Sequence, residues 1–236
     1  MSAERLGDIA RFYELLSELE ERLGGKRTLG DLSGITFPDR GVYFFFEPSE
    51  NRSDSGHGSR VVRVGTHAVS AGSKTKLRSR LAQHRGAVKS GGGNHRGSIF
   101  RLIVGEALAA RHPELICPHW SKGSSAPASI CSGEQILEAA VSAYLRSMPF
   151  VWIEADDPSG KESIRNTVER NSIAMLSNYG RHEEDVVDPL STSWLGGRSG
   201  RAKVRGSGLW NSNYVDDGTY DPGFLGQLEG LVRRTI

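Results

Sequence analysis

Two side chains that can handle a phosphate ester, Arg80 and His84, stand four residues apart. On a helix this spacing puts both on one face, beside the apolar stripe of Leu77 and Leu81. An arginine fork can bind two phosphate oxygens at once, and a histidine can orient or carry a proton. The segment therefore predicts a helix that presents a cation and a proton carrier to one pocket; the alternatives are a surface arginine and a packed or capping histidine.

Glu169 is a carboxylate in an apolar setting. On a helical wheel it falls on the arc of Ile173 and Leu176, which should face the core. A carboxylate there is costly unless it is paired with a cation or binds a metal ion. Three interpretations stay open: a ligand of Mg2+ or Mn2+, a buried salt bridge with an arginine of the basic segment, and an edge position that reaches solvent. A single carboxylate suits Mg2+, which keeps several waters.

The charge of the chain is unevenly distributed, although its formal net charge is only +2. Residues 60–101 contain no Asp or Glu, and we call them the acid-free stretch. Such a stretch suits contact with a polyanion, because each Lys or Arg that meets a phosphate releases a counterion. The alternative is a solvated basic surface. The stretch holds ten basic residues: Arg60, Arg63, Lys74, Lys76, Arg78, Arg80, Arg85, Lys89, Arg96 and Arg101.

Length and composition bound the class of protein. The chain has 236 residues with 37% hydrophobic residues and 29 Gly, enough for one large domain or a medium domain with an appendage. No apolar run reaches the roughly 18 residues of a membrane span, and no signal peptide is evident. Two cysteines make a disulfide framework implausible and favour a reducing cytoplasm. The sequence contains no P-loop or GxGxxG motif, which disfavours a nucleotide cofactor. The spacing of its Cys and His residues matches no common zinc site.

The elements that must position these residues follow from periodicity and breaker residues. We expect an α/β (α+β) fold with a small, mainly antiparallel three-stranded sheet flanked by helices, an N-terminal helix and a C-terminal extension. The predicted strands are 42–46, 61–65 and 149–155. The predicted helices are 6–19, 74–88, 98–110, 134–146, 163–178 and 224–232. Residues 47–60 and 111–133 have loop composition.

The same reading divides the chain into three parts. Residues 1–36 form an N-terminal helical segment, 37–180 form the central domain with an insertion at about 111–147, and 181–236 form a C-terminal extension. Composition changes after residue 180, where an acidic cluster gives way to a segment rich in Ser, Gly and Arg.

Four sequence elements occur in an order that resembles the GIY-YIG nuclease family. They are the strand tripeptides Gly41-Val42-Tyr43 and Arg63-Val64-Gly65, the helix motif Arg80-Leu81-x-x-His84, and a later helix with Glu169 and Asn178. The resemblance covers about residues 41–180. The chain departs from the family pattern at Arg63, where the family has a tyrosine, and in the short spacing from Glu169 to Asn178.

The resemblance implies a divalent-metal-dependent endonuclease and assigns roles to these positions. Arg80 would clamp the phosphate and Glu169 would hold Mg2+ or Mn2+. Tyr43, with His84 or His95, would handle the proton of the attacking water; the alternative for Tyr43 is a core aromatic. Arg63 would add a phosphate contact and could lower the pKa of Tyr43.

DNA is the partner that the resemblance and the basic stretch imply. The residues expected to contact it are Lys74, Lys76, Arg78, Arg85, Arg96, Asn178, Arg201, Lys203 and Arg205. Residues 190–215 combine cations with aromatic and amide side chains and are a candidate recognition arm. The alternative is a tail that packs on the domain through Trp194, Trp210 and Tyr214, and the two are compatible.

The predicted activity is hydrolysis of DNA phosphodiester bonds by a restriction or defence enzyme. A repair nuclease for damaged or branched DNA is the second hypothesis, and a nucleic-acid-binding module without turnover is the third. An interaction scaffold would leave the order of Tyr43, Arg80 and Glu169 unexplained. Since one such site cuts one strand, a homodimer is one route to double-strand cleavage.

Overall fold

The computed structural model describes residues 3–235, so residues 1, 2 and 236 of the predicted terminal segments lie outside it. Its helices and strands are α1 (Ala3–Arg22), β1 (Arg27–Thr28), β2 (Gly41–Asn51), β3 (Ser59–Gly65), α2 (Leu77–Arg85), α3 (Ile99–Arg111), α4 (Ala128–Gly133), α5 (Gln135–Ser147), β4 (Pro149–Glu154), α6 (Ile164–Leu176), α7 (Ala202–Ser207) and α8 (Phe224–Arg234). Short 3-10 turns lie at His95–Gly97, Pro113–Leu115, Glu183–Asp185 and Leu195–Arg198.

The sheet is antiparallel and has the strand order β1-β4-β2-β3, which confirms the mixed α/β class. The prediction of three strands is wrong, because β1 adds a fourth. Arg27 and Thr28 pair with Phe150 and Pro149 at the start of β4. Two residues are too few to show the alternation by which a strand is found in a sequence.

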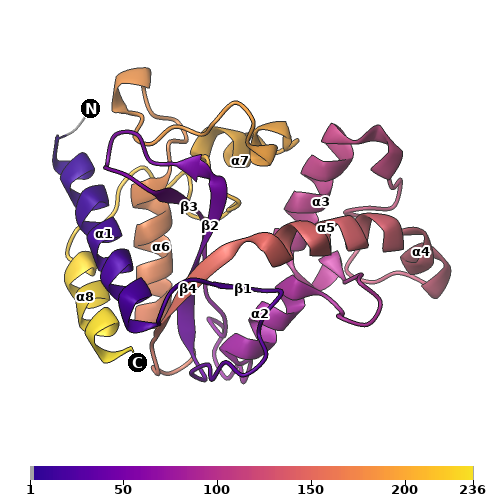
Figure 1. Cartoon of the computed structure of the whole chain (residues 1–236), viewed down its shortest axis with the longest axis horizontal. Coiled ribbons are helices and arrows are strands. Elements are labelled where there is room, and N and C mark those ends of the chain that lie inside the picture. Colours follow the sequence, from indigo (N-terminus) through magenta and orange to yellow (C-terminus); the bar gives the residue numbers. More distant parts are fainter. Residues whose placement is uncertain (1–2, 236) are drawn as a thin grey trace.

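Alternate side chains of β2 enter two different cores. Val42 and Phe44 join the core covered by α1, α6 and α8, whereas Tyr43 and Phe45 join the core covered by α2, α3 and α5. Figure 1 shows these helices on opposite sides of the sheet, with α1 and α8 side by side. Burial of both faces explains why β2 reads as an almost continuous bulky run.

The helix predictions hold with altered ends. The predicted helices 98–110 and 134–146 correspond to α3 and α5. The basic helix is shorter than predicted, because Lys76 is extended and Gly86 has a positive φ of 76°. Helix α6 ends at Leu176, so Asn178 lies beyond it. The segment 111–133, expected to be irregular, contains the short helix α4.

The predicted loop 47–60 is largely β-structure, because β2 continues to Asn51 and β3 begins at Ser59. Its acidic residues are paired within the protein. The Glu47 carboxylate accepts hydrogen bonds from the indole N–H groups of Trp194 (3.1 Å) and Trp210 (2.7 Å). Glu50 forms an ion pair with Arg60 at 2.7 Å. The two tryptophans that bind Glu47 lie more than 100 residues further along the chain, so local composition could not predict them.

The C-terminal extension packs on the sheet, as the second interpretation of this segment anticipated. Trp194 and Trp210 are buried, and the backbone N–H of Trp210 donates to the carbonyl of Val62 at 2.7 Å. The Asn211 side chain bonds both the N–H and the carbonyl of Val64. Residues 210 and 211 therefore satisfy the backbone groups of β3 that face away from β2.

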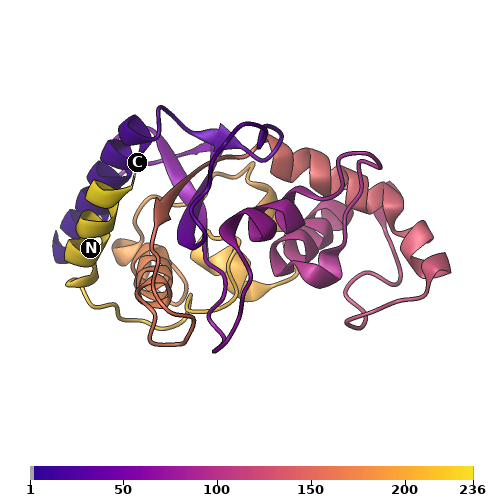
Figure 2. The same ribbon diagram turned by 90° about the horizontal axis from the view of Figure 1, so that it is seen from below.

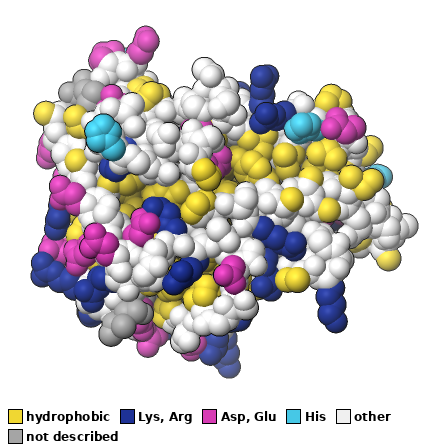
Figure 3. Space-filling model, viewed as in Figure 1, with side chains coloured by type: hydrophobic (Ala, Val, Ile, Leu, Met, Phe, Trp, Pro, Cys, Tyr) yellow, Lys and Arg dark blue, Asp and Glu magenta, His cyan; other side chains and the backbone are white. Residues whose placement is uncertain are grey.

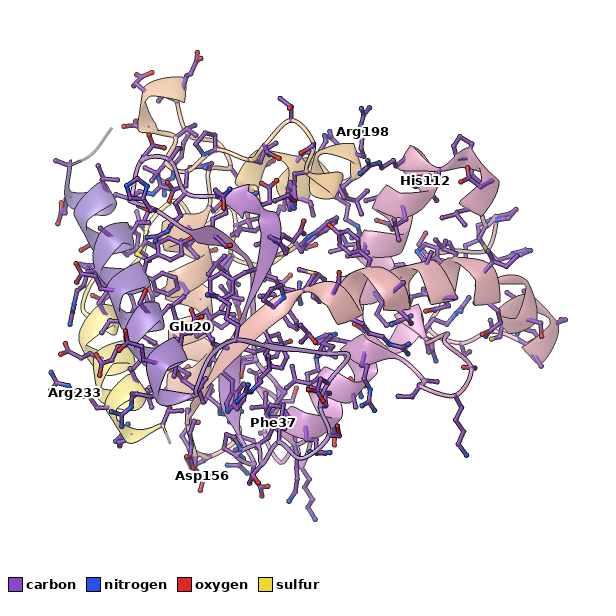
Figure 4. All side chains as sticks on the ribbon, in the orientation of Figure 1. Glu20, Phe37, His112, Asp156, Arg198 and Arg233 are labelled. Atoms are coloured by element: carbon purple, nitrogen blue, oxygen red, sulfur yellow. The ribbon has the colours of Figure 1, made fainter. Side chains whose placement is uncertain are left out.

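Aromatic packing fixes the chain that leads into β2. Phe37, labelled in Figure 4, stacks on Phe150 and lies with its ring centre 4.7 Å from that of Trp152.

Cys117 and Cys131 are both free. Within residues 3–235, no helix combines the length and apolarity needed to span a bilayer.

Replacing Glu47 by Ala tests the attachment of the C-terminal extension. The substitution leaves two buried indole N–H groups without an acceptor, so the free energy of unfolding should fall by about 2–3 kcal/mol. Urea unfolding monitored by tryptophan fluorescence measures this change. The exposed Glu184→Ala is the control and should change it by less than about 0.5 kcal/mol. Equal effects of both variants would contradict the attachment.

Candidate active site

A buried chain of hydrogen bonds connects β2, α2 and α3. The Tyr43 hydroxyl lies 2.8 Å from Nε2 of His84, and Nδ1 of His84 lies 2.8 Å from the hydroxyl of Ser98. Ser98 caps α3 by accepting the Arg101 N–H, which fixes its oxygen. Both nitrogens of His84 therefore have partners, and the Tyr43 ring is held against the end of β3.

Gly65 makes the approach of Tyr43 possible. The two residues face each other across β2 and β3, and a Cβ on Gly65 would lie 2.4 Å from the Tyr43 hydroxyl oxygen. That separation is shorter than a non-bonded carbon–oxygen contact, so a larger residue would displace the phenol. A glycine is therefore required sterically at the end of the second tripeptide.

His84 is held as a neutral ring. Its pKa lies well below the usual value because the ring is buried and because Arg80, Arg63 and Arg101 repel a positive charge. A neutral imidazole has one donor and one acceptor nitrogen. If Nδ1 donates to Ser98, Nε2 accepts the Tyr43 hydroxyl proton, which leaves the phenol lone pairs available to another donor.

Glu169 lies across the pocket on α6, which packs against β3. Its Oε1 accepts the backbone N–H of Thr66 at 3.2 Å. Burial raises the pKa of Glu169 to about 7, although the charges of Arg63 and Arg80 and the Thr66 hydrogen bond lower it. The carboxylate is therefore near the midpoint of its titration at neutral pH, and a bound cation would favour its charged form.

The charges of Arg63 and Arg80, which come from two elements, both act on this carboxylate. Arg63 donates to the carbonyl of Trp210 and lies 4.6 Å from the centre of the Phe100 ring. Burial lowers its pKa, and the negative charges of Tyr43 and Glu169 would oppose that effect. Within residues 3–235, neither arginine forms a salt bridge with a carboxylate, which leaves room for an anion.

Helices α2 and α6 lie on either side of the ends of β2 and β3 (Figure 2). The structure thus brings together four residues that the sequence predicted for one site: Tyr43, Arg80, His84 and Glu169. Arg63, which was also predicted for this site, acts electrostatically on the same carboxylate. Arg80 also bonds Gln83 and the carbonyl of Gly97, at 3.0 and 3.2 Å.

His95 has different partners. Its Nδ1 and its backbone N–H both bond Glu138, at 2.9 and 2.6 Å, and its ring stacks on Trp120. The same carboxylate binds Arg101, which in turn donates to the carbonyl of His84. No contact in the described chain joins the His95 ring to Tyr43 or Glu169, so the structure connects it to the site only through this network.

Several cations of the acid-free stretch meet carboxylates from elsewhere in the chain. Arg60 pairs with Glu50, Lys76 with Asp39, Arg96 with Glu134 and Arg101 with Glu138. Lys74 is exposed, and Arg78 binds the carbonyl of Ile35. On the face in Figure 3, acidic side chains gather on the side of α1 and are few on the side of α3 and α5.

The predicted DNA contacts of the C-terminal extension are also engaged within the protein. Arg201 forms two hydrogen bonds to Glu106, and Lys203 pairs with Asp216 at 2.8 Å. Arg205 bonds the carbonyl of Ser199. Asn178 bonds Arg5 and the backbone of Val187, and these contacts tie the chain end of α6 to α1.

Two residues of the site were not predicted from the sequence. Ser98 holds His84, and His67 lies two residues beyond Gly65 with its ring buried and within electrostatic range of Arg80. Ser98 could have been found as a residue that precedes an apolar helix, a frequent capping position. His67 has a weaker signal, its place just after the second tripeptide.

A groove of about 1120 Å³ lies along the face of α6 that carries Asn166 and Arg170. Its walls are residues 69–71 and 160–162, the α6 side chains Asn166 and Arg170, and Tyr214. The Tyr214 hydroxyl bonds Asn166, and the charge of Glu169 raises the pKa of Tyr214 in addition to burial. Tyr214, a wall residue of the groove, is therefore within electrostatic range of the carboxylate.

The donor set around Glu169 fits a hard divalent cation. Among residues 3–235 the carboxylate hydrogen bonds through Oε1 alone, and no cluster of three or more His, Cys, Asp or Glu side chains could hold a metal ion. A cation at Glu169 would take its other ligands from water and from a phosphate, which is usual for Mg2+.

Comparisons with known proteins give one match. A family model described as GIY-YIG domain matches residues 3–236, which is nearly the whole chain. Comparison with curated proteins and with solved structures gives no match.

The raised pKa of Glu169 predicts a pH-dependent effect of Glu169→Gln on stability. In the folded protein the charged form is disfavoured, so the stability that wild type draws from protonated Glu169 is complete below about pH 4.5 and lost by about pH 7. The variant should therefore gain stability relative to wild type as the pH rises from 5 to 8, in metal-free buffer with a chelator. Urea unfolding at both pH values measures this.

The exposed Glu21→Gln on α1 is the matched control for that experiment. A stability difference between wild type and Glu169→Gln that stays constant from pH 5 to pH 8 would show that the carboxylate is not held as described.

Proposed function

The chain belongs to the GIY-YIG family, and on this premise we propose that it is a divalent-metal-dependent endonuclease that hydrolyses DNA phosphodiester bonds. Members of this family are generally endonucleases, and a nuclease domain implies DNA as the partner. The observation that carries the proposal is the buried hydrogen bond between Tyr43 and His84, with Arg63 and Arg80 in electrostatic range of Glu169.

Each residue of the pocket has a task in this reaction. Arg80 binds the non-bridging oxygens of the scissile phosphate and offsets the negative charge that grows there. His84 accepts a hydrogen bond from the Tyr43 hydroxyl, which directs a phenol lone pair toward the attacking water. Tyr43 thereby orients this water. Arg63 favours the charged state of Glu169.

Glu169 is the residue that would hold Mg2+ or Mn2+. Such a cation supplies charge stabilisation on the phosphate and on the leaving oxygen. The Thr66 N–H bond holds one carboxylate oxygen and leaves the other free for coordination.

The groove along α6 supports a path for the DNA strand. Lys161 and Arg170 on its walls suit backbone phosphates, and Tyr214 suits a base. We assign the enzyme to the restriction or defence type, which requires cleavage at defined sequences.

A plasmid-nicking assay with Mg2+ tests the activity. Wild type should convert supercoiled plasmid to the nicked form, and a chelator should stop the reaction. Arg80→Ala and Glu169→Ala should each lower the rate by about 10²–10³-fold, and Tyr43→Phe by about 10²-fold. Arg11→Ala, an exposed cation on α1, should cleave like wild type. Full activity in both Arg80→Ala and Glu169→Ala would refute the assignment of the site.

Mapping the cut positions separates the remaining hypotheses. Discrete fragments from an undamaged plasmid support the restriction type. Cleavage only after ultraviolet damage, or only at branched junctions, would favour a repair nuclease. DNA binding without cleavage under Mg2+ or Mn2+ would favour a binding module, for which Arg63 at the family's tyrosine position is the best support.

The double substitution Lys161→Ala with Arg170→Ala tests the groove. Each lost phosphate contact should reduce the dependence of log K on log salt by about 0.9, and the affinity for duplex DNA should fall. Fluorescence anisotropy over a salt series measures both values. An unchanged salt slope would place the DNA elsewhere.

A further inference from the structure

His67 is a buried imidazole without a hydrogen-bond partner. Its side chain is 5% exposed, and within residues 3–235 neither Nδ1 nor Nε2 has a partner. The other two buried histidines differ, since both nitrogens of His84 and one nitrogen of His95 are hydrogen bonded. Buried polar side chains are nearly always hydrogen bonded, so an exception indicates a missing partner.

The surroundings of His67 are cationic. The guanidinium of Arg165 donates to the His67 carbonyl, and burial together with Arg165, Arg80 and Arg40 lowers the pKa of His67 to about 4. Arg165 is paired with Asp157, whose carbonyl also binds Arg40. Arg80 has no such carboxylate in the described chain, so the positive charge beside the His67 ring is uncompensated.

These features define the chemistry of the missing partner. A neutral imidazole offers one N–H donor, and its neighbours favour a negative charge. The partner should therefore be an anion that can accept a hydrogen bond from the ring and bind the arginine fork at the same time. A phosphate oxygen meets both requirements.

The position of His67 connects it to the site and to the groove. It follows Thr66, whose N–H binds Glu169, and it precedes residues 69–71 of the groove wall. Between them, Ala68 has a φ of 55°, a conformation that costs a non-glycine residue about 1 kcal/mol or more. Such backbone is kept where the surroundings fix it, and here it sets the direction in which the chain leaves His67.

We propose that His67 is a phosphate-binding residue whose ring N–H donates to a non-bridging oxygen of the scissile phosphate while Arg80 binds another. This inference rests on the proposed function, because it names the group at the same site that the DNA backbone would meet.

Substitution by an apolar residue separates this role from a structural one. His67→Leu removes a buried polar group that has no partner, so the unfolding midpoint should stay the same or rise. Plasmid cleavage should nevertheless fall by about 10- to 100-fold in kcat/KM, the loss expected for one hydrogen bond to a charged group. His67→Gln, which keeps an N–H donor, should retain more activity, and His57→Leu in the exposed hairpin loop is the control.

A lower unfolding midpoint for His67→Leu together with a cleavage rate equal to that of wild type would overturn the proposal, because His67 would then serve only the fold.

A binding measurement without metal distinguishes failure of this inference from failure of the proposed function. In protein with 15N-labelled histidine and a chelator, inorganic phosphate should shift the ring signals of His67, but not those of His57, and the shift should shrink in Arg80→Ala. Unmoved His67 signals in a protein that cleaves plasmid would refute the inference alone. Shifted signals in a protein that cleaves no DNA would support phosphate binding by His67 and refute the nuclease.

Discussion

Positive charge outweighs negative charge where α2, α6 and the ends of β2 and β3 meet. The charges of Arg63 and Arg80 act on the carboxylate of Glu169, and within the described residues neither arginine has a salt bridge. Burial disfavours even that one negative charge and raises the pKa of Glu169 to about 7. Burial and the charges of Arg80, Arg63 and Arg101 keep the His84 ring neutral. Under the proposed function, the phosphate of a bound DNA strand would offset this positive charge.

The C-terminal extension fixes the position of β3 and of Arg63. The C-terminal extension satisfies the outer edge of β3 through residues 210 and 211, and the Trp210 carbonyl accepts a hydrogen bond from Arg63. The Glu47 carboxylate binds two indoles of the same segment. Carboxylates outside the acid-free stretch neutralise Arg60, Arg96 and Arg101, whereas Arg63 and Arg80 form no salt bridge within residues 3–235.

Local patterns in the sequence predicted much of this arrangement. The spacing of Arg80 and His84 and the apolar arc around Glu169 gave the elements that carry the site, and the helices α3 and α5 followed from periodicity. What could not be predicted depends on residues far apart: β1 is too short for a pattern, and β2 continues through Glu47 because two distant tryptophans bind it. His67 was missed for the same reason. Its lack of a partner is a property of the folded chain, and no motif records it.

The position of a metal ion relative to Glu169 tests the account most directly. A crystal soaked with Mn2+ and measured at the manganese absorption edge gives that position from anomalous scattering, without knowledge of the DNA sequence that is cut. The account predicts a peak at about 2.1 Å from the free carboxylate oxygen of Glu169, facing Tyr43 and Arg80, and no such peak in Glu169→Gln. A peak at another site, or one that survives in the variant, would contradict it.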